Sequence, residues 1–325
     1  MDQRRDSPSK SISKSMFSRK LNWLFWGNLA AALLHLASFI AALCVILITE
    51  KRIPVLVSTD FTTVTNDIVS VDSNVSVFNG IVWLIIAVPI ITSLFHFLIV
   101  VLRFVVFDFS ILKNPTQAVR YANRCFQNYS QRPLSAFSSS FLLYYRNAVV
   151  LGVNPLRWLE YSISSTLMII VISLLAGISN AFLLVAQAFL NIGLMVVGGF
   201  YFEVDNIGYR TFSGKSLRNV KWRFFLIGCL IFLIQWLPIF TYFFTAVSSS
   251  KDLPWFVYTV ILVLFALFTL FAANALFHYL SIPLFKDFVN YEIYYIFLSF
   301  TAKFALDWIL IAGILSERND LQVST

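Results

Sequence analysis

Seven long apolar stretches divide this chain, and they constrain its fold more than any other feature of the sequence. Each is about as long as the 20-residue helix that crosses a bilayer core of roughly 30 Å. They cover residues 23–48, 79–103, 155–177, 181–201, 224–247, 255–280 and 293–316. Only 12% of the residues are charged, against about 25% in soluble domains. No barrel-like alternation covers the chain, so we predict an all-α membrane protein with seven transmembrane helices.

The lysines and arginines outside these stretches are distributed unevenly between the two faces of the predicted bundle. Seven spans place the N-terminal tail and the loops after the second, fourth and sixth spans on one face. Counted with Arg103 and Arg157 at the ends of their stretches, this face holds nineteen Lys and Arg, and the other face holds four. The positive-inside rule therefore predicts a cytoplasmic N-terminus and an extracellular C-terminus. The net charge of +8 follows from this asymmetry and does not indicate binding to nucleic acid.

The same pattern predicts a cytoplasmic basic tail, a seven-helix domain and an extracellular tail over residues 1–22, 23–316 and 317–325. Residues 49–78 are rich in Val, Thr and Ile with partial alternation, which predicts a small outer β-hairpin lying over the mouth of the bundle. This segment holds a glycosylation sequon at Asn74. Residues 104–153 form a long basic inner loop, either an interfacial helix on an anionic leaflet or a solvated connector. The three cysteines show no spacing typical of a metal site or a disulfide framework.

Three ionisable residues are expected inside the spans once the loop charges are set aside: Glu160, Lys303 and Asp307. At 1.5 Å of rise per residue, Lys303 lies roughly 9 Å and Glu160 about 7.5 Å from the inner ends of their spans. His96 in the second span lies about 10 Å from the same face. A buried ammonium or iminium keeps its charge when a buried carboxylate lies beside it. We therefore expect Lys303 and Glu160 at the same level inside the bundle.

Simpler explanations exist for each of these residues. Lys303 could be a structural or snorkelling lysine, and Glu160 could form a boundary ion pair with Arg157. A histidine in a span is more often a hydrogen-bonded packing residue than a proton carrier. The residues alone leave open whether Lys303 holds a cofactor through a Schiff base or interacts with a transported ion.

The stretch NPLRWLEYSISSTLM, residues 154–168, resembles the third helix of the heliorhodopsins, a distant branch of the microbial rhodopsins. GNLAAALLH in the first span and FHF in the second agree with this resemblance, as does Ser299 four residues before Lys303. The inverted topology and an outer loop with strand character are also typical of that family. The resemblance covers roughly residues 23–316.

This resemblance implies a light-sensing retinal protein, not an enzyme, with a slow photocycle and a homodimeric assembly in the lipid bilayer. Family members bind all-trans retinal as a protonated Schiff base on the lysine that matches Lys303, with the glutamate that matches Glu160 as counterion. Around the Schiff base we expect Ser299, Ser164 and Asp307. The polar cavity that accepts the released proton is expected to contain His35, His96 and Asn28. For the retinal pocket we expect Asn191, Leu194, Trp236, Phe268 and Phe271.

Two acids keep other functions open. Asp307 adds a carboxyl group one turn outward of Lys303, and Glu203 lies near the inner mouth. Together with Glu160 and the histidines they could extend a path for protons or cations. A light-gated proton or cation channel or transporter on the same scaffold is therefore the main alternative. An unrelated transporter that uses Lys303 as a substrate charge is a third hypothesis.

Overall fold

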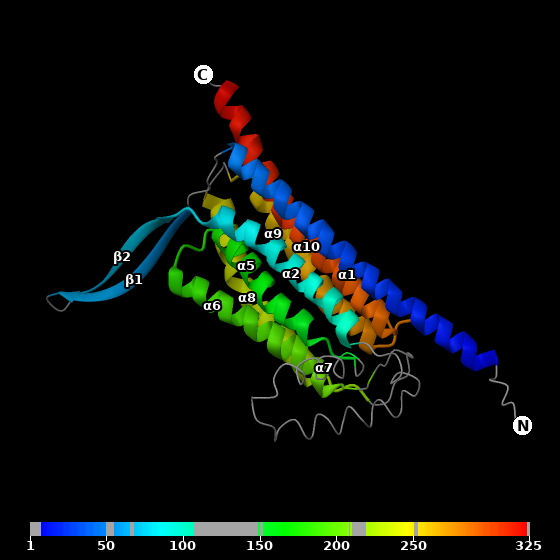
Figure 1. Cartoon of the computed structure of the whole chain (residues 1–325). Helices are drawn as coiled ribbons and strands as arrows, with labels where there is room; N and C mark the ends of the chain where they lie inside the picture. Colours follow the sequence, from blue (N-terminus) through cyan, green and yellow to red (C-terminus); the bar gives the residue numbers. More distant parts are fainter. Residues whose placement is uncertain are drawn as a thin grey trace, which may run out of the picture.

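The fold is a bundle of helices with one short two-stranded sheet (Figure 1). The computed structural model describes residues 8–49, 55–65, 68–106, 149, 152–207, 209, 219–249 and 253–323. Within these residues, seven helices are long and apolar enough to span a membrane, which confirms the predicted number of spans. The helices are α1 (Pro8–Thr49), α2 (Ile81–Val106), α5 (Pro155–Leu175), α6 (Ala181–Gly193) with its continuations η3 (Leu194–Tyr201) and α7 (Phe202–Asp205), α8 (Arg223–Ser249), α9 (Trp255–Tyr279) and α10 (Phe288–Val323).

Helix α5 begins where the sequence predicts it. The side chain of Asn154 caps the helix by accepting a hydrogen bond from the backbone N–H of Arg157 at 3.3 Å. Pro155 occupies the first turn, where its missing N–H costs no helical hydrogen bond. The helix ends before Gly177, whose φ of +99° lets the chain turn into α6. Of the seven spans, α5 has the largest buried share, so it carries much of the interior of the bundle.

The fourth span is longer at its C-terminal end, and the seventh at its N-terminal end, than expected. The fourth runs without a break from α6 through α7 to Asp205, and α10 begins at Phe288. Acidic residues interrupt the apolar pattern at both places, which is why the sequence places these boundaries at 201 and 293. Glu160, Lys303 and Asp307 lie inside the spans as expected, but the expectation that no other ionisable residue does is wrong. Arg157, Glu203 and Glu292 are also buried in these helices.

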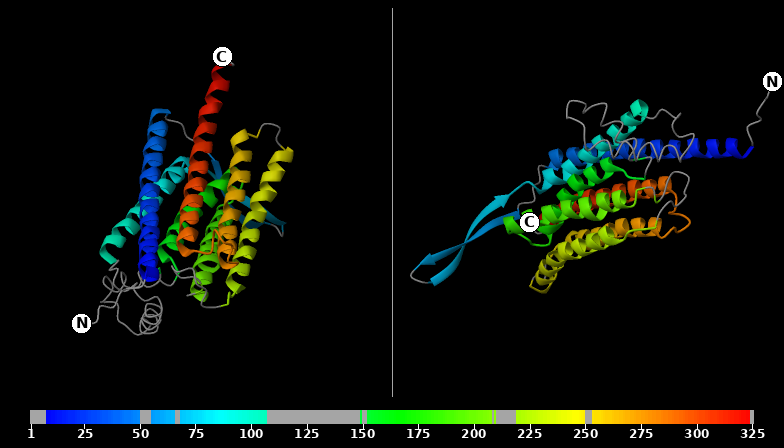
Figure 2. Two further views of the ribbon diagram at one scale, coloured as in Figure 1. Left: turned by 90° about the vertical axis from the view of Figure 1, so that its right-hand side faces the viewer. Right: turned by 90° about the horizontal axis from the view of Figure 1, so that it is seen from below.

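The spans pack so that α5 lies among its neighbours while α1 and α8 lie at the sides. Helix α5 contacts α2, α6, η3 and α9, and α10 packs against α9, α1 and α2. The two views of Figure 2 show these helices side by side along one common direction. Helix α1 begins at the end of the bundle opposite to the end where α10 finishes, as an odd number of spans requires (Figure 1).

Strands β1 (Val55–Thr65) and β2 (Ile68–Phe78) form the predicted hairpin between α1 and α2. Each has eleven residues, so the hairpin is roughly 36 Å long at about 3.3 Å per residue. Its base is held by a backbone hydrogen bond of 2.9 Å from Ser58 N–H to the carbonyl of Ser179. From there it projects away from the helices and does not cover the mouth of the bundle, contrary to expectation (Figures 1 and 2). The strands pair with each other along their whole length, and Val55, Val57 and Phe78 at the base pack against the core of the helices.

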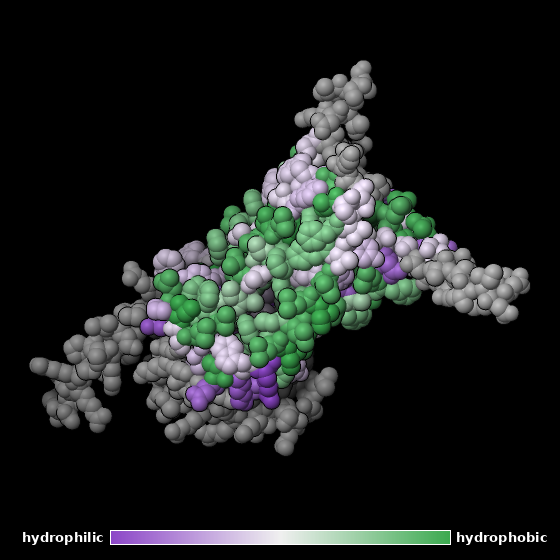
Figure 3. Space-filling model, turned by 180° about the vertical axis from the view of Figure 1, so that it is seen from behind, coloured by the Kyte–Doolittle hydropathy of each residue, from purple (hydrophilic) through white to green (hydrophobic). Residues whose placement is uncertain are grey.

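The outer surface of the helices is apolar. Large side chains such as Phe189, Leu233 and Leu237 are exposed, and Figure 3 shows apolar residues as a broad band across the helices. The most hydrophilic residues lie at the lower edge of this band (Figure 3). This is the surface of an integral, multi-pass membrane protein. The interfacial helix considered for residues 104–153 falls mostly on 107–148, outside the described residues.

Candidate functional site

Lys303 on α10 and Glu160 on α5 form an ion pair inside the bundle. The Nζ atom of Lys303 lies 2.6 Å from Oε1 of Glu160, and both side chains are almost fully buried. Lys303 also donates a hydrogen bond to Oγ of Ser299, one turn earlier on α10, at 2.7 Å. Glu160 therefore pairs with Lys303, and the alternative of a boundary pair between Glu160 and Arg157 is wrong.

A threonine that the sequence did not point to binds the carboxylate of this ion pair. Thr92 on α2 donates a hydrogen bond from Oγ1 to Oε1 of Glu160 at 2.7 Å and is fully buried. It lies one turn before His96 on the same helix, and this four-residue spacing is the signal that could have identified it. Ser164, one turn after Glu160, is also buried, and its hydroxyl has no hydrogen-bond partner among the described residues.

The two predicted histidines lie next to each other between α1 and α2. Their rings are stacked, with centroids 6.1 Å apart and planes within 8° of parallel. Nδ1 of His96 shares a hydrogen bond of 2.8 Å with Oδ1 of Asn28. His35 packs edge-on against Phe300, and its Nε2 atom has no partner among the residues that the structure describes. The structure thus brings His35, His96 and Asn28 together in one buried polar group on the side of Lys303 that faces α1.

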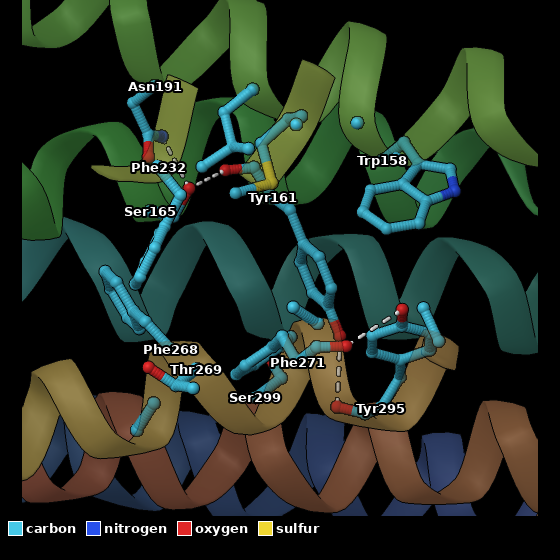
Figure 4. Close-up of a pocket in the computed structure, with 18 of the residues that line it drawn as sticks. Trp158, Tyr161, Ser165, Asn191, Phe232, Phe268, Thr269, Phe271, Tyr295 and Ser299 are labelled. Carbon is cyan, nitrogen blue, oxygen red and sulfur yellow. Dashed lines mark hydrogen bonds between the residues drawn. The ribbon is translucent and has the colours of Figure 1, made fainter. Parts of the chain in front are cut away.

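A cavity of about 350 Å³ opens on the other side of Lys303, between α5, η3, α8, α9 and α10. This volume is within the roughly 300–1,000 Å³ of small-molecule sites. Figure 4 shows Asn191 and Ser165 at one end, Trp158 and Tyr295 at the other, and Tyr161, Phe271 and Ser299 between them. The walls are mostly aromatic and aliphatic, and Lys303 itself lines the cavity. An elongated apolar ligand can therefore reach Nζ of Lys303 from this side.

Most residues expected in the pocket line this cavity. Asn191, Leu194, Phe268 and Phe271 do so, and Asn191 is held by hydrogen bonds from its Nδ2 to Ser165 and Thr166 at 2.7 and 2.9 Å. Trp236 does not reach the lining. Its buried ring packs behind the wall, with its centroid 5.0 Å from that of Phe265 and 6.1 Å from that of Phe268.

The π-helical segment η3 shapes one wall of the cavity through two glycines. A π-helix is rare and is found frequently at functional sites. A Cβ atom on Gly199 would lie 2.3 Å from the ring of Trp158, and one on Gly198 would lie 2.7 Å from the Cα of Gly228 on α8. The absence of side chains here lets the Trp158 ring and α8 approach η3, and these contacts fix the position of the wall.

A second ionic group lies at the end of α5 where Asn154 caps the helix. Arg157 forms ion pairs with both Glu203 on α7 and Glu292 on α10, and all three side chains are buried. Its guanidinium lies over the rings of Trp158 and Tyr295, with the carbon 4.7 and 4.2 Å from their centroids. We call Arg157, Glu203 and Glu292 the inner ion cluster. Arg157 lies at the start of its apolar stretch and was counted with the charges of the adjoining loop, so the sequence did not predict this cluster.

Glu203 is fully engaged within the inner ion cluster. Besides Arg157, it accepts hydrogen bonds from Nε1 of Trp158 at 2.8 Å, the hydroxyl of Tyr291 at 2.9 Å and the backbone N–H of Asn154 at 3.2 Å. Its side chain has no exposed surface. A carboxylate with four donors is fixed in place, so in this conformation Glu203 holds helices together and does not line an open path.

Asp307 has the opposite environment. It is fully buried on α10, and neither carboxyl oxygen has a hydrogen-bond partner among the described residues. The site thus contains one cation beside a well-satisfied carboxylate, and a second carboxyl group one turn away with no donor.

In a comparison with protein families, residues 129–315 match the family described as Heliorhodopsin. This range is more than half of the chain and includes α5, the cavity walls and the lysine-bearing part of α10. A comparison with curated proteins gives no match.

Proposed function

The chain belongs to the heliorhodopsin family, whose members are retinal-binding, light-sensing rhodopsins, and from this premise we propose that Lys303 holds the retinal and Glu160 is its counterion. The observation that supports this assignment is the buried contact of 2.6 Å between Nζ of Lys303 and Oε1 of Glu160 at the edge of the apolar cavity. A lysine that forms an imine with an aldehyde is commonly one held in a desolvated site.

The residues around the cavity fit a retinal. The cavity has the volume of a small-molecule site, aromatic walls and a buried amine, and its polar groups are few. When bound, retinal supplies the absorption of light and the isomerisation that follows, and we propose the all-trans isomer for the resting state on the basis of the resemblance. The chain supplies the fixed charges. Ser299 and Thr92 hold Lys303 and Glu160 in place through hydrogen bonds of 2.7 Å each.

We propose that the buried polar group of His35, His96 and Asn28 accepts the proton that leaves Nζ of Lys303. Imidazole is the side chain that exchanges a proton near neutral pH. The free Nε2 atom of His35 and the hydrogen bond that orients His96 suit this role. Ser164 lines the cavity beside Glu160 and would adjust the environment of the same nitrogen.

The orientation and assembly belong to the same proposal. The excess of Lys and Arg on one face supports a cytoplasmic N-terminus, an extracellular C-terminus and an extracellular hairpin. A homodimer is expected from the resemblance. We propose that the protein is a photoreceptor and not an enzyme, with a slow photocycle that changes the conformation of the inner face.

Reconstitution with all-trans retinal tests this proposal. Wild-type protein should give a visible pigment, Lys303→Ala should give none, and Glu160→Gln should give a red-shifted one because the counterion loses its charge. Lys221→Ala is the matched control, since it removes a half-exposed lysine outside the cavity and should keep the pigment. A wild-type sample with the spectrum of free retinal would refute the function, and an unchanged colour in Glu160→Gln would refute the counterion.

A light-gated proton or cation conductor is a second candidate, supported by the partnerless carboxyl of Asp307. The fixed environment of Glu203 argues against it, because the proposed path would have to break an ion pair with Arg157 and three further hydrogen bonds at the inner end. Photocurrents under illumination, recorded over a range of voltage and pH, decide between the two functions. A current that is lost in Asp307→Asn would favour conduction.

A further inference from the structure

Asp307 is the buried ionisable group that the proposed function does not use. We infer that Asp307 carries a proton in the resting protein and is the internal donor that returns a proton to Nζ of Lys303. This inference rests on the proposed function of Lys303, but the protonated state of Asp307 does not depend on retinal.

The contacts of Asp307 are those of a neutral group. The residue is 0% exposed, and both carboxyl oxygens lack a hydrogen-bond donor within the described part of the chain. Ser38 on α1 is the polar side chain within reach of the carboxyl group, but no hydrogen bond of normal geometry joins the two among the described residues. An ionised carboxylate in an apolar interior, without a donor or a cation in contact, costs far more than a neutral acid. A protonated carboxyl group removes that cost.

The charge balance at this level of the bundle points the same way. Lys303 interacts with both acids, but its direct contact is with Glu160, which also accepts the hydrogen bond from Thr92. Arg157 is held by the two glutamates of the inner ion cluster. One cation at the site therefore balances one carboxylate, and a second ionised acid would leave an excess negative charge buried.

Among the side chains that the structure describes, the titratable groups on the neighbouring helices do not supply a further cation. Helix α1 presents His35 and α2 presents His96, a stacked pair of histidines in a buried site. Helix α5 presents Glu160, which is already paired. On α9 the titratable side chains are in its first and last turns: Tyr258, His278 and Tyr279.

The position of Asp307 suits transfer to Lys303. It lies four residues further along α10, so the two Cα atoms are about 6 Å apart along the axis and on one face. When Nζ has lost its proton, the carboxyl O–H of Asp307 gives its proton to that nitrogen and becomes a carboxylate. The carboxylate then takes the proton back from the histidine group, through the unpartnered Nε2 of His35, the hydroxyl of Ser38 and waters that such groups hold. One proton circulates, and none crosses the membrane.

Three measurements on Asp307→Asn test the donor. In the resting, retinal-free protein at neutral pH, the infrared C=O band of a protonated carboxylic acid should be present in the wild type and absent in the variant. In the pigment, the colour should stay that of the wild type, because one neutral group replaces another, whereas Glu160→Gln shifts it. Return of the proton to Nζ of Lys303 should slow by roughly 10²-fold or more and recover with azide, a small diffusible weak acid.

Each other result overturns the inference. If the wild type has no carboxylic-acid band that is lost in Asp307→Asn, then Asp307 is ionised. A red shift of the Asp307→Asn pigment like that of Glu160→Gln would mean the same. An unchanged rate of proton return means that Asp307 is protonated but not the donor. If Asp307→Asn does not fold, Asp307→Glu should keep the acid band at a changed frequency and change the rate, and an identical band and rate would refute the assignment. A wild type that forms no pigment refutes the retinal function, while the infrared result still reports on Asp307.

Discussion

Removal of the arginine of the inner ion cluster should destabilise the protein more than any other single charge change at this end of the bundle. In Arg157→Gln, the carboxylates of Glu203 and Glu292 stay buried without a cation. Breaking a buried ion pair by removing one partner costs about 3–5 kcal/mol, because the other charge is left uncompensated. Here one change strands two carboxylates, with exposures of 0% and 2%. The loss of the guanidinium over the rings of Trp158 and Tyr295 adds about 0.5–2 kcal/mol.

Glu292→Gln is the matched control, because the cluster holds one cation and two carboxylates. Removing one negative charge leaves Arg157 paired with Glu203, so the cluster becomes neutral. The cost should be about 1 kcal/mol, from the hydrogen bond of 2.8 Å that Asn154 donates to Glu292 and that an amide accepts less well. The triple variant Arg157→Gln, Glu203→Gln, Glu292→Gln should recover part of the loss, since it leaves no buried charge in the cluster.

Thermal unfolding in detergent measures these differences, followed by the loss of pigment colour and by circular dichroism on the same samples. We expect the unfolding temperature to fall in the order wild type, Glu292→Gln, triple variant, Arg157→Gln. The colour of the folded pigment should change little, because the cluster does not contact Lys303. Equal unfolding temperatures for Arg157→Gln and Glu292→Gln would refute the reasoning that buried charge balance stabilises this end of the bundle.

Three further changes have direct readouts. Gly199→Ala should lower the yield of pigment, because the added Cβ would lie 2.3 Å from the Trp158 ring and force that ring toward the cavity. Titration with retinal measures the yield, and a yield equal to that of the wild type would contradict this prediction. Thr92→Val should lower the free energy of unfolding by about 1.5–3 kcal/mol through the lost hydrogen bond to the Glu160 carboxylate, measured by denaturation, whereas a neutral effect would show that Glu160 has another donor. Asn74 is exposed on the hairpin, so expression in a eukaryotic membrane should give a glycan that Asn74→Gln removes, and a sequon that is never modified would count against the proposed orientation.

Much of the fold could be predicted from the sequence, because the thickness of the bilayer sets the length of the apolar stretch that a spanning helix needs. The seven spans and the start of α5 at Asn154 and Pro155 were found in this way. The inner ends of the fourth and seventh spans were not, since Glu203 and Glu292 look like loop residues when their common partner is unknown. A hydropathy profile treats each charged residue as isolated. In the structure, Arg157 forms ion pairs with Glu203 and Glu292 from two other segments of the chain.

The candidate site was predictable where depth along a helix decides proximity. Counting residues from the span ends placed Lys303 and Glu160 at one level, and the structure puts them in contact. Depth does not say which way a side chain points around its helix, so Trp236 was expected in the cavity although it packs behind the wall. Thr92 was missed because a threonine in an apolar helix is usually bonded to its own backbone, and here its hydroxyl reaches Glu160 instead.

The site at Lys303 and the inner ion cluster share helices α5 and α10, and aromatic rings connect them. Tyr161 and Trp158 on α5 line the cavity, and so does Tyr295 on α10. The hydroxyl of Tyr161 donates to the backbone carbonyl of Tyr295 at 3.0 Å, and the indole N–H of Trp158 donates to Glu203. A ligand that changes shape in the cavity must press on these rings, because close-packed interiors transmit displacement. The cluster is therefore the place where a change at Lys303 would first alter the packing of the inner ends of α5, α7 and α10, which is where a light signal would have to appear.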